Sequence, residues 1–327
     1  MDTFLQQVIN GLTAGSVYAI VALGYTMVYG IIQLINFAHG EVVMIGAMVA
    51  FTVINALAPS GLPALAVVLI GTGCAVPVCI LVGYSMERLA YRPLRGAPRL
   101  APLITAIGVS IILQHLALMI WSRNVLAFPQ IIASRTYFIG GAAITTVQIA
   151  ILAICVALMV GLALLVYRTR LGTAMRATAQ NPQVAGLMGI DVNRVIAATF
   201  VIGAALGAVA GVLFGTYYGL AQYTMGSILG LKAFSAAVLG GIGNIPGAMA
   251  GGIVLGLVEA LGAGYIGDLT DLCQYGFLAR AFDACEGGGH FILFGSNYQD
   301  VFAFVVLILV LVFRPQGLLG ERVGDRA

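Results

Sequence analysis

Few residues in this sequence could do acid–base or metal chemistry, and most of them lie inside or beside long apolar runs. Glu259 stands within one run, His115 follows Gln114 in a second, and Glu41 lies close to His39 at the start of a third. Ionisable side chains in such places are candidates for function, because a charge in lipid is costly. The alternative is a polar group that is satisfied by a neighbouring helix. A proton relay would need several such groups in series, and the sequence does not show them.

Common catalytic and phosphate-binding motifs are absent. Lys232 is the only lysine and follows Leu231 rather than glycine, so the sequence contains no G-x-x-x-x-G-K-[ST] phosphate loop. The histidines His39, His115 and His290 are far apart and form no H-x-x-x-H pair, which excludes zinc ligands that are local in sequence. No G-x-S-x-G motif occurs, which argues against a serine hydrolase. We therefore expect no catalytic residue, no metal site and no cofactor.

The composition is that of a membrane protein. Hydrophobic residues make up 61% of the chain and charged residues 8%, against about 25% charged residues in a soluble domain. Apolar runs suited to membrane helices occupy residues 4–28, 42–57, 62–84, 101–121, 147–167 and 195–214, with two more candidates in 229–266 and a last one at 301–313. Because backbone in lipid must satisfy its own hydrogen bonds, these runs predict helices. We expect one all-α, polytopic membrane domain over residues 1–327.

The basic residues predict which segments face the cytoplasm. Segments 87–99 and 168–194 hold eight of the fifteen basic residues, so the positive-inside rule places both in the cytoplasm. Residues 267–300 hold five acidic residues against Arg280 alone and are expected to form an external loop. An external N-terminus and about nine crossings follow. The number is eight if residues 31–40 or 229–242 only dip into the membrane.

Glycine placement predicts close helix packing. The chain has 43 glycines. One set of them recurs at every fourth residue from Gly203 to Gly215. This spacing puts them on one helix face, where small residues let two backbones approach. Residues 239–252 add Asn244 and Pro246 to several glycines and should interrupt a helix. A broken or re-entrant helix is tolerated where it is buried or lines a cavity.

The polar segment 168–194 contains the signals of a short helix outside the bilayer. Asn181 can cap it, Pro182 suits its first position, Gly189 can end it, and Asp191 can cap the membrane helix that begins near residue 192. Three apolar residues then lie along one side of the expected helix at residues 182–188: Val184, Leu187 and Met188. Such a side could enter a groove on another protein or lie on the lipid surface.

Five segments together carry a family resemblance. They are residues 11–47 (GLTAGSVYAIVALGYTMVYGIIQLINFAHGEVVMIGA), 87–96 (ERLAYRPLRG), 168–194 with the run RVIAATFVIGAALGAVAGVL that begins at Arg194, 232–252 (KAFSAAVLGGIGNIPGAMAGG) and 314–321 (RPQGLLGE). In these segments the chain resembles the LivH-type permease subunits of branched-chain amino-acid ABC importers. The resemblance implies a multi-pass protein of the bacterial inner membrane. It also implies a second, LivM-like permease, two separate ATP-binding cassette subunits and a periplasmic substrate-binding protein as partners. No nucleic-acid partner is expected.

The resemblance also implies roles for particular residues. Those of the cytoplasmic coupling loop that contacts an ATPase would be Asn181, Pro182, Ala185, Gly189 and Asp191. The segment from Asn36 to Glu41, which includes His39, is similar to the family's motif beside the substrate pathway. Our candidates for residues of the substrate pathway are therefore Asn36, His39, Glu41 and Glu259.

One region departs from the family pattern. Residues 271–298 form an insertion in the expected external loop, where the binding protein would dock. Cys273 and Cys285 lie 12 positions apart within it. An oxidising exterior would allow them to pair as a disulfide, and the alternative is two unpaired thiols.

The leading functional hypothesis is an importer permease without catalytic chemistry of its own. Leu, Ile and Val are the leading substrates, although permeases of the same family handle urea, amides or other amino acids. A self-sufficient channel or ion-coupled carrier would have the same composition. It predicts transport by this chain alone, whereas the permease hypothesis predicts none without ATPase subunits. A membrane enzyme would need a catalytic constellation that the sequence lacks.

Overall fold

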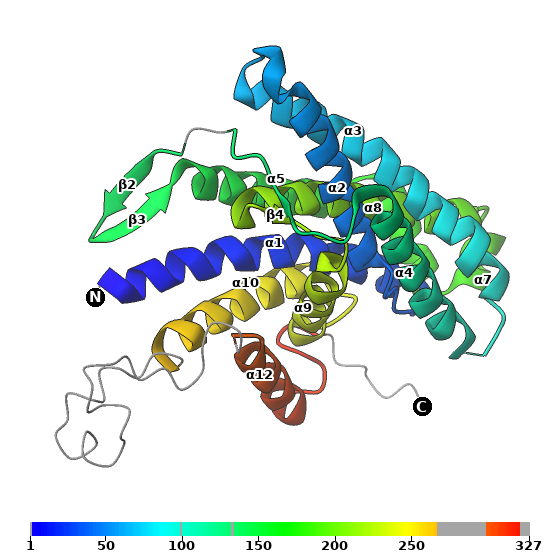
Figure 1. Ribbon diagram of the computed structural model, residues 1–327. Coiled ribbons are helices and arrows are strands. Elements are labelled where there is room, and N and C mark those ends of the chain that lie inside the picture. The colour runs from blue at the N-terminus through cyan, green and yellow to red at the C-terminus, as the bar shows by residue number, and fades with distance from the viewer. Residues whose placement is uncertain (1, 99, 132–133, 267–298, 321–327) are drawn as a thin grey trace.

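Long apolar helices make up most of the chain (Figure 1). The computed structural model describes residues 2–98, 100–131, 134–266 and 299–320. Seven helices in this part are long and apolar enough to cross a membrane: α1 (Asp2–Ile32), α2 (His39–Leu57), α3 (Ala64–Ser85), α4 (Leu100–Trp121), α5 (Thr146–Arg168), α8 (Val192–Tyr218) and α10 (Ile245–Leu261). Two apolar helices are shorter: α9 (Met225–Gly240) and α12 (Gln299–Phe313). The predicted all-α, polytopic fold is confirmed.

Short elements connect the long helices. The helical connections are η1 (Ala58–Ser60), η2 (Met86–Tyr91), η3 (Arg92–Leu94), α6 (Arg170–Gln180), α7 (Pro182–Leu187) and η4 (Gly262–Ile266). The strands form two antiparallel pairs that the sequence did not predict: β1 (Leu126–Ala127) with β4 (Leu220–Ala221), and β2 (Thr136–Ile139) with β3 (Ala142–Thr145). The second pair is a hairpin that leads directly into α5.

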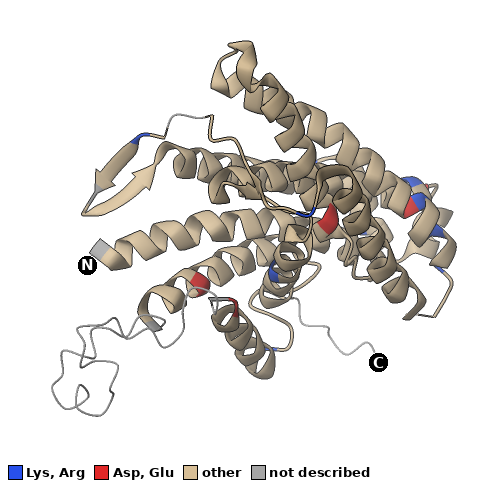
Figure 2. Cartoon of the chain, viewed as in Figure 1, with Lys and Arg blue, Asp and Glu red and all other residues tan. Residues whose placement is uncertain are grey.

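The molecule has two distinct ends along the direction of α1 (Figure 1). At the hairpin end, the start of α1 lies beside β2 and β3, and the amide of Ala143 donates to Oε1 of Gln6 at 2.8 Å. At the α7 end, Arg95 of the basic segment 87–99 hydrogen-bonds Asn193 at the start of α8. Figure 2 shows several Lys and Arg residues close together at this end. The two basic segments therefore occupy one end, as their predicted common side requires.

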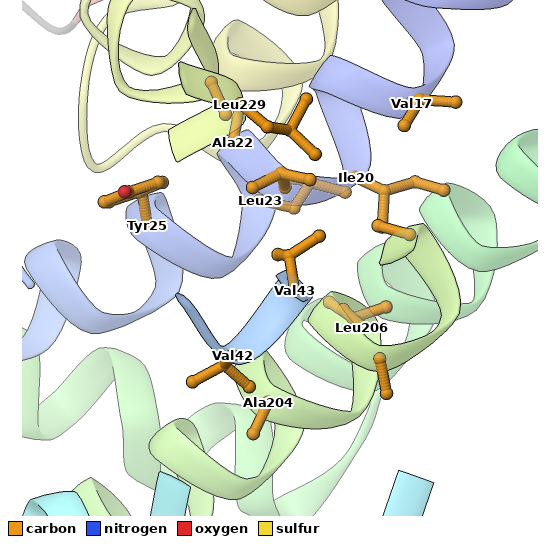
Figure 3. Close-up of a cluster of buried hydrophobic side chains, with 14 of the residues drawn as sticks. Val17, Ile20, Ala22, Leu23, Tyr25, Val42, Val43, Ala204, Leu206 and Leu229 are labelled. Atoms are coloured by element: carbon orange, nitrogen blue, oxygen red, sulfur yellow. The ribbon is translucent and has the colours of Figure 1, made fainter. Parts of the chain in front are cut away.

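The core lies where α1, α2, α8 and α9 meet. Figure 3 shows buried apolar side chains from these four helices directed toward one another, among them Leu23, Val43, Leu206 and Leu229. Helix α1 is the most central and packs along α10, α8, α9 and α5. By contrast, α4 exposes large apolar side chains along most of its length. This distribution suits a helix at the periphery that faces lipid or another membrane subunit.

Glycines make the close helix contacts that their spacing predicts. Gly203, Gly207 and Gly211 of α8 face α1 and α2. Gly252 of α10 lies so close to α1 that a Cβ atom there would be 2.5 Å from Cα of Ala19. These helices can approach only because no side chain separates their backbones.

The predicted interruption in residues 239–252 is also present. Helix α9 ends at Gly240, and α10 begins at Ile245 after a turn in which Gly241 has a φ of 106°. The backbone at the end of α9 is satisfied by the chain after α12, because the amide of Leu318 donates to the carbonyl of Leu239 at 2.8 Å. Part of this break is therefore packed against protein, although Gly243 and Pro246 are exposed, and a broken helix is tolerated where it is buried.

Candidate functional site

The polar segment 168–194 folds into two short helices, and local side chains define the second of them. Oδ1 of Asn181 accepts hydrogen bonds from the amides of Gln183 and Val184 at 3.0 and 3.1 Å. Pro182 is the first residue of α7, where its missing N–H costs nothing. Helix α7 ends at Leu187, one residue before the predicted end, because Met188 forms its C-cap.

The chain leaves α7 through a turn that glycine makes possible. Gly189 has a φ of 84°, a conformation that other residues rarely adopt. Oδ1 of Asp191 then accepts from the amide of Arg194 at 3.1 Å, which caps α8 at Val192 as predicted. An ion pair of 3.0 Å between Asp191 and Arg194 adds to this cap. Helix α7 thus lies between its own capped start at Asn181 and the capped start of α8 at Asp191.

Helix α7 has one side packed on the protein and one side fully presented. Ala185, on the inner side of α7, is buried. Leu187 and Met188 are 86% and 78% exposed, and Val184 is half exposed. Large apolar side chains with this exposure, at the end of a membrane protein where the basic residues gather, are unusual outside a contact surface. We call Val184, Leu187 and Met188 the α7 surface.

A buried ion cluster supports the start of α8 next to the α7 surface, and sequence reasoning did not identify it. Glu87 is fully buried and accepts from Nε and Nη2 of Arg92 at 3.2 Å each. It also accepts from Arg95, which in turn donates to Asn193. The signal that could have revealed it is a lone glutamate at the end of an apolar run, followed by arginines at the fifth and eighth positions.

A second polar cluster centres on Glu41, near the start of α2. Its side chain is 0% exposed. Oε1 accepts from Oγ of Ser110 at 3.1 Å, from Nε2 of Gln114 at 2.8 Å and from Oγ of Ser227 at 3.0 Å. One carboxylate oxygen therefore joins α2, α4 and α9. Hydrogen bonds to a charged acceptor are about twice as strong as neutral ones.

Asn36 and His39 lie in the same region as Glu41. Oδ1 of Asn36 accepts from the Tyr91 hydroxyl at 2.7 Å and from the Ala38 amide at 3.1 Å. His39 is buried, and its ring centre lies 5.0 Å from that of Tyr25. Residues 33–38, between α1 and α2, are not helical. The structure thus brings together three of the four predicted pathway residues at a break between two helices.

A cavity of about 180 Å³ lies beside the Glu41 cluster. Its polar wall includes Ser110 and Ser227, which both donate to Glu41. Ile107 of α4 and Leu231 of α9 also line it, and both are about half exposed. We call the surface formed by these four residues the α4–α9 face. Serine hydroxyl groups are enriched where membrane helices contact one another.

Glu259, the fourth predicted pathway residue, lies apart from the other three. Its Oε1 accepts from Nζ of Lys232 at 2.6 Å and from the Tyr18 hydroxyl at 3.4 Å. On α1, Tyr18 contacts Glu259 and Gly24 contacts His39. These two residues are six positions apart, which separates the two contacts by about 9 Å along the helix. The structure does not join Glu259 to the Asn36, His39 and Glu41 group.

The remaining sequence candidates have simpler outcomes. Nδ1 of His115 lies 2.9 Å from the carbonyl of Ile111 in its own helix, so its polar group is satisfied locally. The sequence drew attention to Lys232 only because no phosphate-loop motif surrounds it. Its being the sole lysine, within an apolar stretch, was itself a signal of a functional residue. Cys273, Cys285 and the insertion 271–298 lie outside the described residues.

Comparison with known proteins gives a family match over most of the chain. Residues 7–311 match the family described as the permease component of branched-chain amino acid transport systems. The chain is 47% identical over 323 residues to the high-affinity branched-chain amino acid transport system permease protein BraD of Pseudomonas aeruginosa. That alignment covers 97% of this chain and 96% of the relative.

Two further relatives carry similar names. The permease protein LivH of the same kind of system in Escherichia coli is 45% identical over 325 residues, which cover 97% of this chain and 96% of that protein. A probable branched-chain amino acid transport permease protein LivH of Methanocaldococcus jannaschii is 28% identical over 92% of this chain and 88% of that protein. These names describe transport permeases rather than enzymes. No solved structure gave a significant match.

Proposed function

The chain belongs to the family of permease components of branched-chain amino acid transport systems, and from this premise we propose that it forms half of the membrane pathway of an ABC importer for Leu, Ile and Val. The resemblance predicted from the sequence is thereby confirmed, and the chain is a multi-pass membrane protein that operates with partner subunits. We place it in the bacterial inner membrane. The near full-length similarity to two curated permeases carries the proposal.

The α7 surface is the proposed contact with an ATPase subunit. In this assignment the α7 end faces the cytoplasm and residues 168–194 form the coupling loop. Asn181, Pro182 and Gly189 fix the ends of α7, and Ala185 seats it on the protein. Asp191 caps the start of α8 just beyond it. A short, rigid helix with an apolar side suits a groove on a soluble partner. ATP hydrolysis would be the work of separate subunits, and this chain would perform no reaction.

The α4–α9 face is the proposed wall of the substrate pathway, opposite a second, LivM-like permease. The supporting observation is the polar group behind this face. Glu41 is held there by donors from two other helices, and Asn36 and His39 lie beside it at a non-helical segment. Intramembrane polar groups commonly mark a pathway. A periplasmic binding protein would deliver the substrate from the hairpin end, where residues 267–300 would form part of an external loop.

Uptake into proteoliposomes tests the proposal. The chain is reconstituted with a LivM-like permease, two ATPase subunits and a binding protein, and radiolabelled leucine is supplied with internal ATP. We expect uptake that disappears when the ATPase subunits are omitted. Uptake by the chain alone would contradict the proposal and favour a self-sufficient channel or carrier. Uptake of urea or an amide, with none of leucine, would keep the permease role but overturn the substrate.

A further inference from the structure

The short element η2 lies between the coupling loop and the break that separates α1 from α2. It is a single turn of π-helix that continues α3, and such turns are rare and often occur at functional sites. It packs against α3, α4 and α8. Two of its buried residues, Glu87 and Tyr91, are bonded in different directions. Glu87 is connected to the start of α8, and Tyr91 to the residues before α2.

Glu87 fixes η2 to the start of α8 through two arginines. Its buried carboxylate accepts from Nε and Nη2 of Arg92 at 3.2 Å, one nitrogen on each oxygen. It also pairs with Nη2 of Arg95, while Nη1 of Arg95 donates to Oδ1 of Asn193. Separating these groups would leave a buried charge uncompensated, which is strongly unfavourable. We therefore expect η2 and the start of α8 to move as one unit.

Tyr91 extends these contacts to the proposed pathway. Its hydroxyl donates to Oδ1 of Asn36 at 2.7 Å, and its ring centre lies 5.3 Å from that of Phe200 in α8. Both Tyr91 and Asn36 are buried, so water does not compete for this hydrogen bond. Asn36 in turn accepts from the Ala38 amide through Oδ1 at 3.1 Å, and from the His39 amide through its carbonyl at 3.0 Å. Tyr91 is thus bonded to the residue that shapes the start of α2.

The segment that receives this hydrogen bond is suited to a change of conformation. Residues 33–38 are not helical. Gln33 at its start has a φ of 52°, which residues other than glycine rarely adopt. Such backbone persists only where its surroundings impose it, and it clusters at switch regions. Displacement of the Tyr91 hydroxyl should therefore shift this segment, and with it Asn36 and His39.

From these contacts we propose that Glu87 and Tyr91 are positioning residues that carry movement of α7 to the substrate pathway. From the start of α8 the route runs through Asn193 and Arg95 to Glu87. It then passes along η2 to Tyr91 and Asn36, by the hydrogen bonds and packed side chains that carry coupling between distant sites. The inference rests on the proposed function, because it assumes that α7 docks on an ATPase subunit and that Asn36 lies beside the pathway. Both positioning residues are buried, so they act through their neighbours and not on substrate or ATPase.

Hydrogen exchange in the assembled transporter, followed by mass spectrometry, tests this route. The chain is placed in lipid nanodiscs with a LivM-like permease, and exchange is compared without ATPase subunits, with them, and with them plus a non-hydrolysable ATP analogue. We expect the ATPase subunits to protect the α7 amides and the analogue to change exchange at residues 33–38. Tyr91→Phe should keep the protection of α7 and reduce the response at residues 33–38 by about fivefold or more, the lower limit of typical coupling between sites. An unreduced response in Tyr91→Phe, or none in the unmodified chain, would overturn the inference alone, whereas unprotected α7 amides would contradict the proposed function as well.

Further variants make the test specific. Tyr84→Phe is the matched control, because it also removes one hydrogen-bonded hydroxyl, which accepts from Arg88 at 3.0 Å on the surface, and it should respond as the unmodified chain does. Asn193→Ala breaks the other end of the route at an exposed position. It should reduce the response at residues 33–38 as Tyr91→Phe does, and it decides the matter if that variant misfolds. The double variant should be no worse than either single one, because the two act in series; losses that multiply would show independent effects and overturn the route.

Discussion

Replacing Leu187 should weaken the ATPase contact without disturbing the fold. Leu187 is 86% exposed in this chain, so Leu187→Ser removes almost no internal packing and should change the free energy of unfolding by less than about 0.5 kcal/mol. Burial of a leucine side chain in a partner's groove is worth about 1.5–3 kcal/mol. Its loss should therefore weaken the affinity for the ATPase subunits by about 10- to 150-fold.

The assay compares three quantities in reconstituted complexes. They are the affinity of the permease pair for the ATPase subunits, the rate of ATP hydrolysis and the rate of leucine uptake. Leu62→Ser is the matched control, because this leucine is also exposed but precedes α3, at the opposite end of that helix from η2. We expect Leu187→Ser to lower affinity and uptake and Leu62→Ser to leave both unchanged. Unchanged affinity in Leu187→Ser, or an equal loss in the control, would refute the reasoning.

Three further predictions concern the support of these sites. Asn181→Ala removes the cap of α7 and should cost about 1 kcal/mol, seen by mass spectrometry as faster hydrogen exchange of the α7 amides; unchanged exchange would contradict the cap. Gly252→Leu must push α1 and α10 apart, which costs about 1–3 kcal/mol or more, and should lower the Tm in detergent. At Gly161 a Cβ atom would meet open space, so Gly161→Leu should leave the Tm unchanged. Equal Tm values for the two variants would count against the close packing of α1 on α10. Glu41→Ala strands Gln114 and two hydroxyl donors and should lower the Tm more than Glu41→Gln, which keeps an acceptor; the reverse order would argue against the hydrogen-bonded cluster.

Features with local causes could be predicted from the sequence. The ends of α7 follow from Asn181, Pro182 and Gly189, and the start of α8 from Asp191, because each acts on backbone within three residues of itself. The long helices follow from apolar runs, whose length is set by the bilayer. The two pairs of short strands were missed, since two to four residues carry too little alternation to be recognised.

The composition of the polar clusters could not be predicted, because their members are far apart in the chain. Glu41 is bonded by residues 69, 73 and 186 positions away. Lys232 and Glu259 are 27 positions apart and lie on different helices. Sequence patterns identified Glu41 and Glu259 as unusual, but only the packing of α2, α4, α9 and α10 decides that the two belong to separate clusters.

Photo-crosslinking from the α7 surface tests the central claim that this helix docks on an ATPase subunit. A benzophenone side chain placed at Met188, which is 78% exposed, reacts with whatever lies against α7 in the assembled transporter. The account predicts a covalent product between this chain and an ATPase subunit, identified by mass spectrometry and lost when that subunit is omitted. Crosslinks to lipid alone, with the complete transporter assembled, would contradict it and place α7 on the membrane surface.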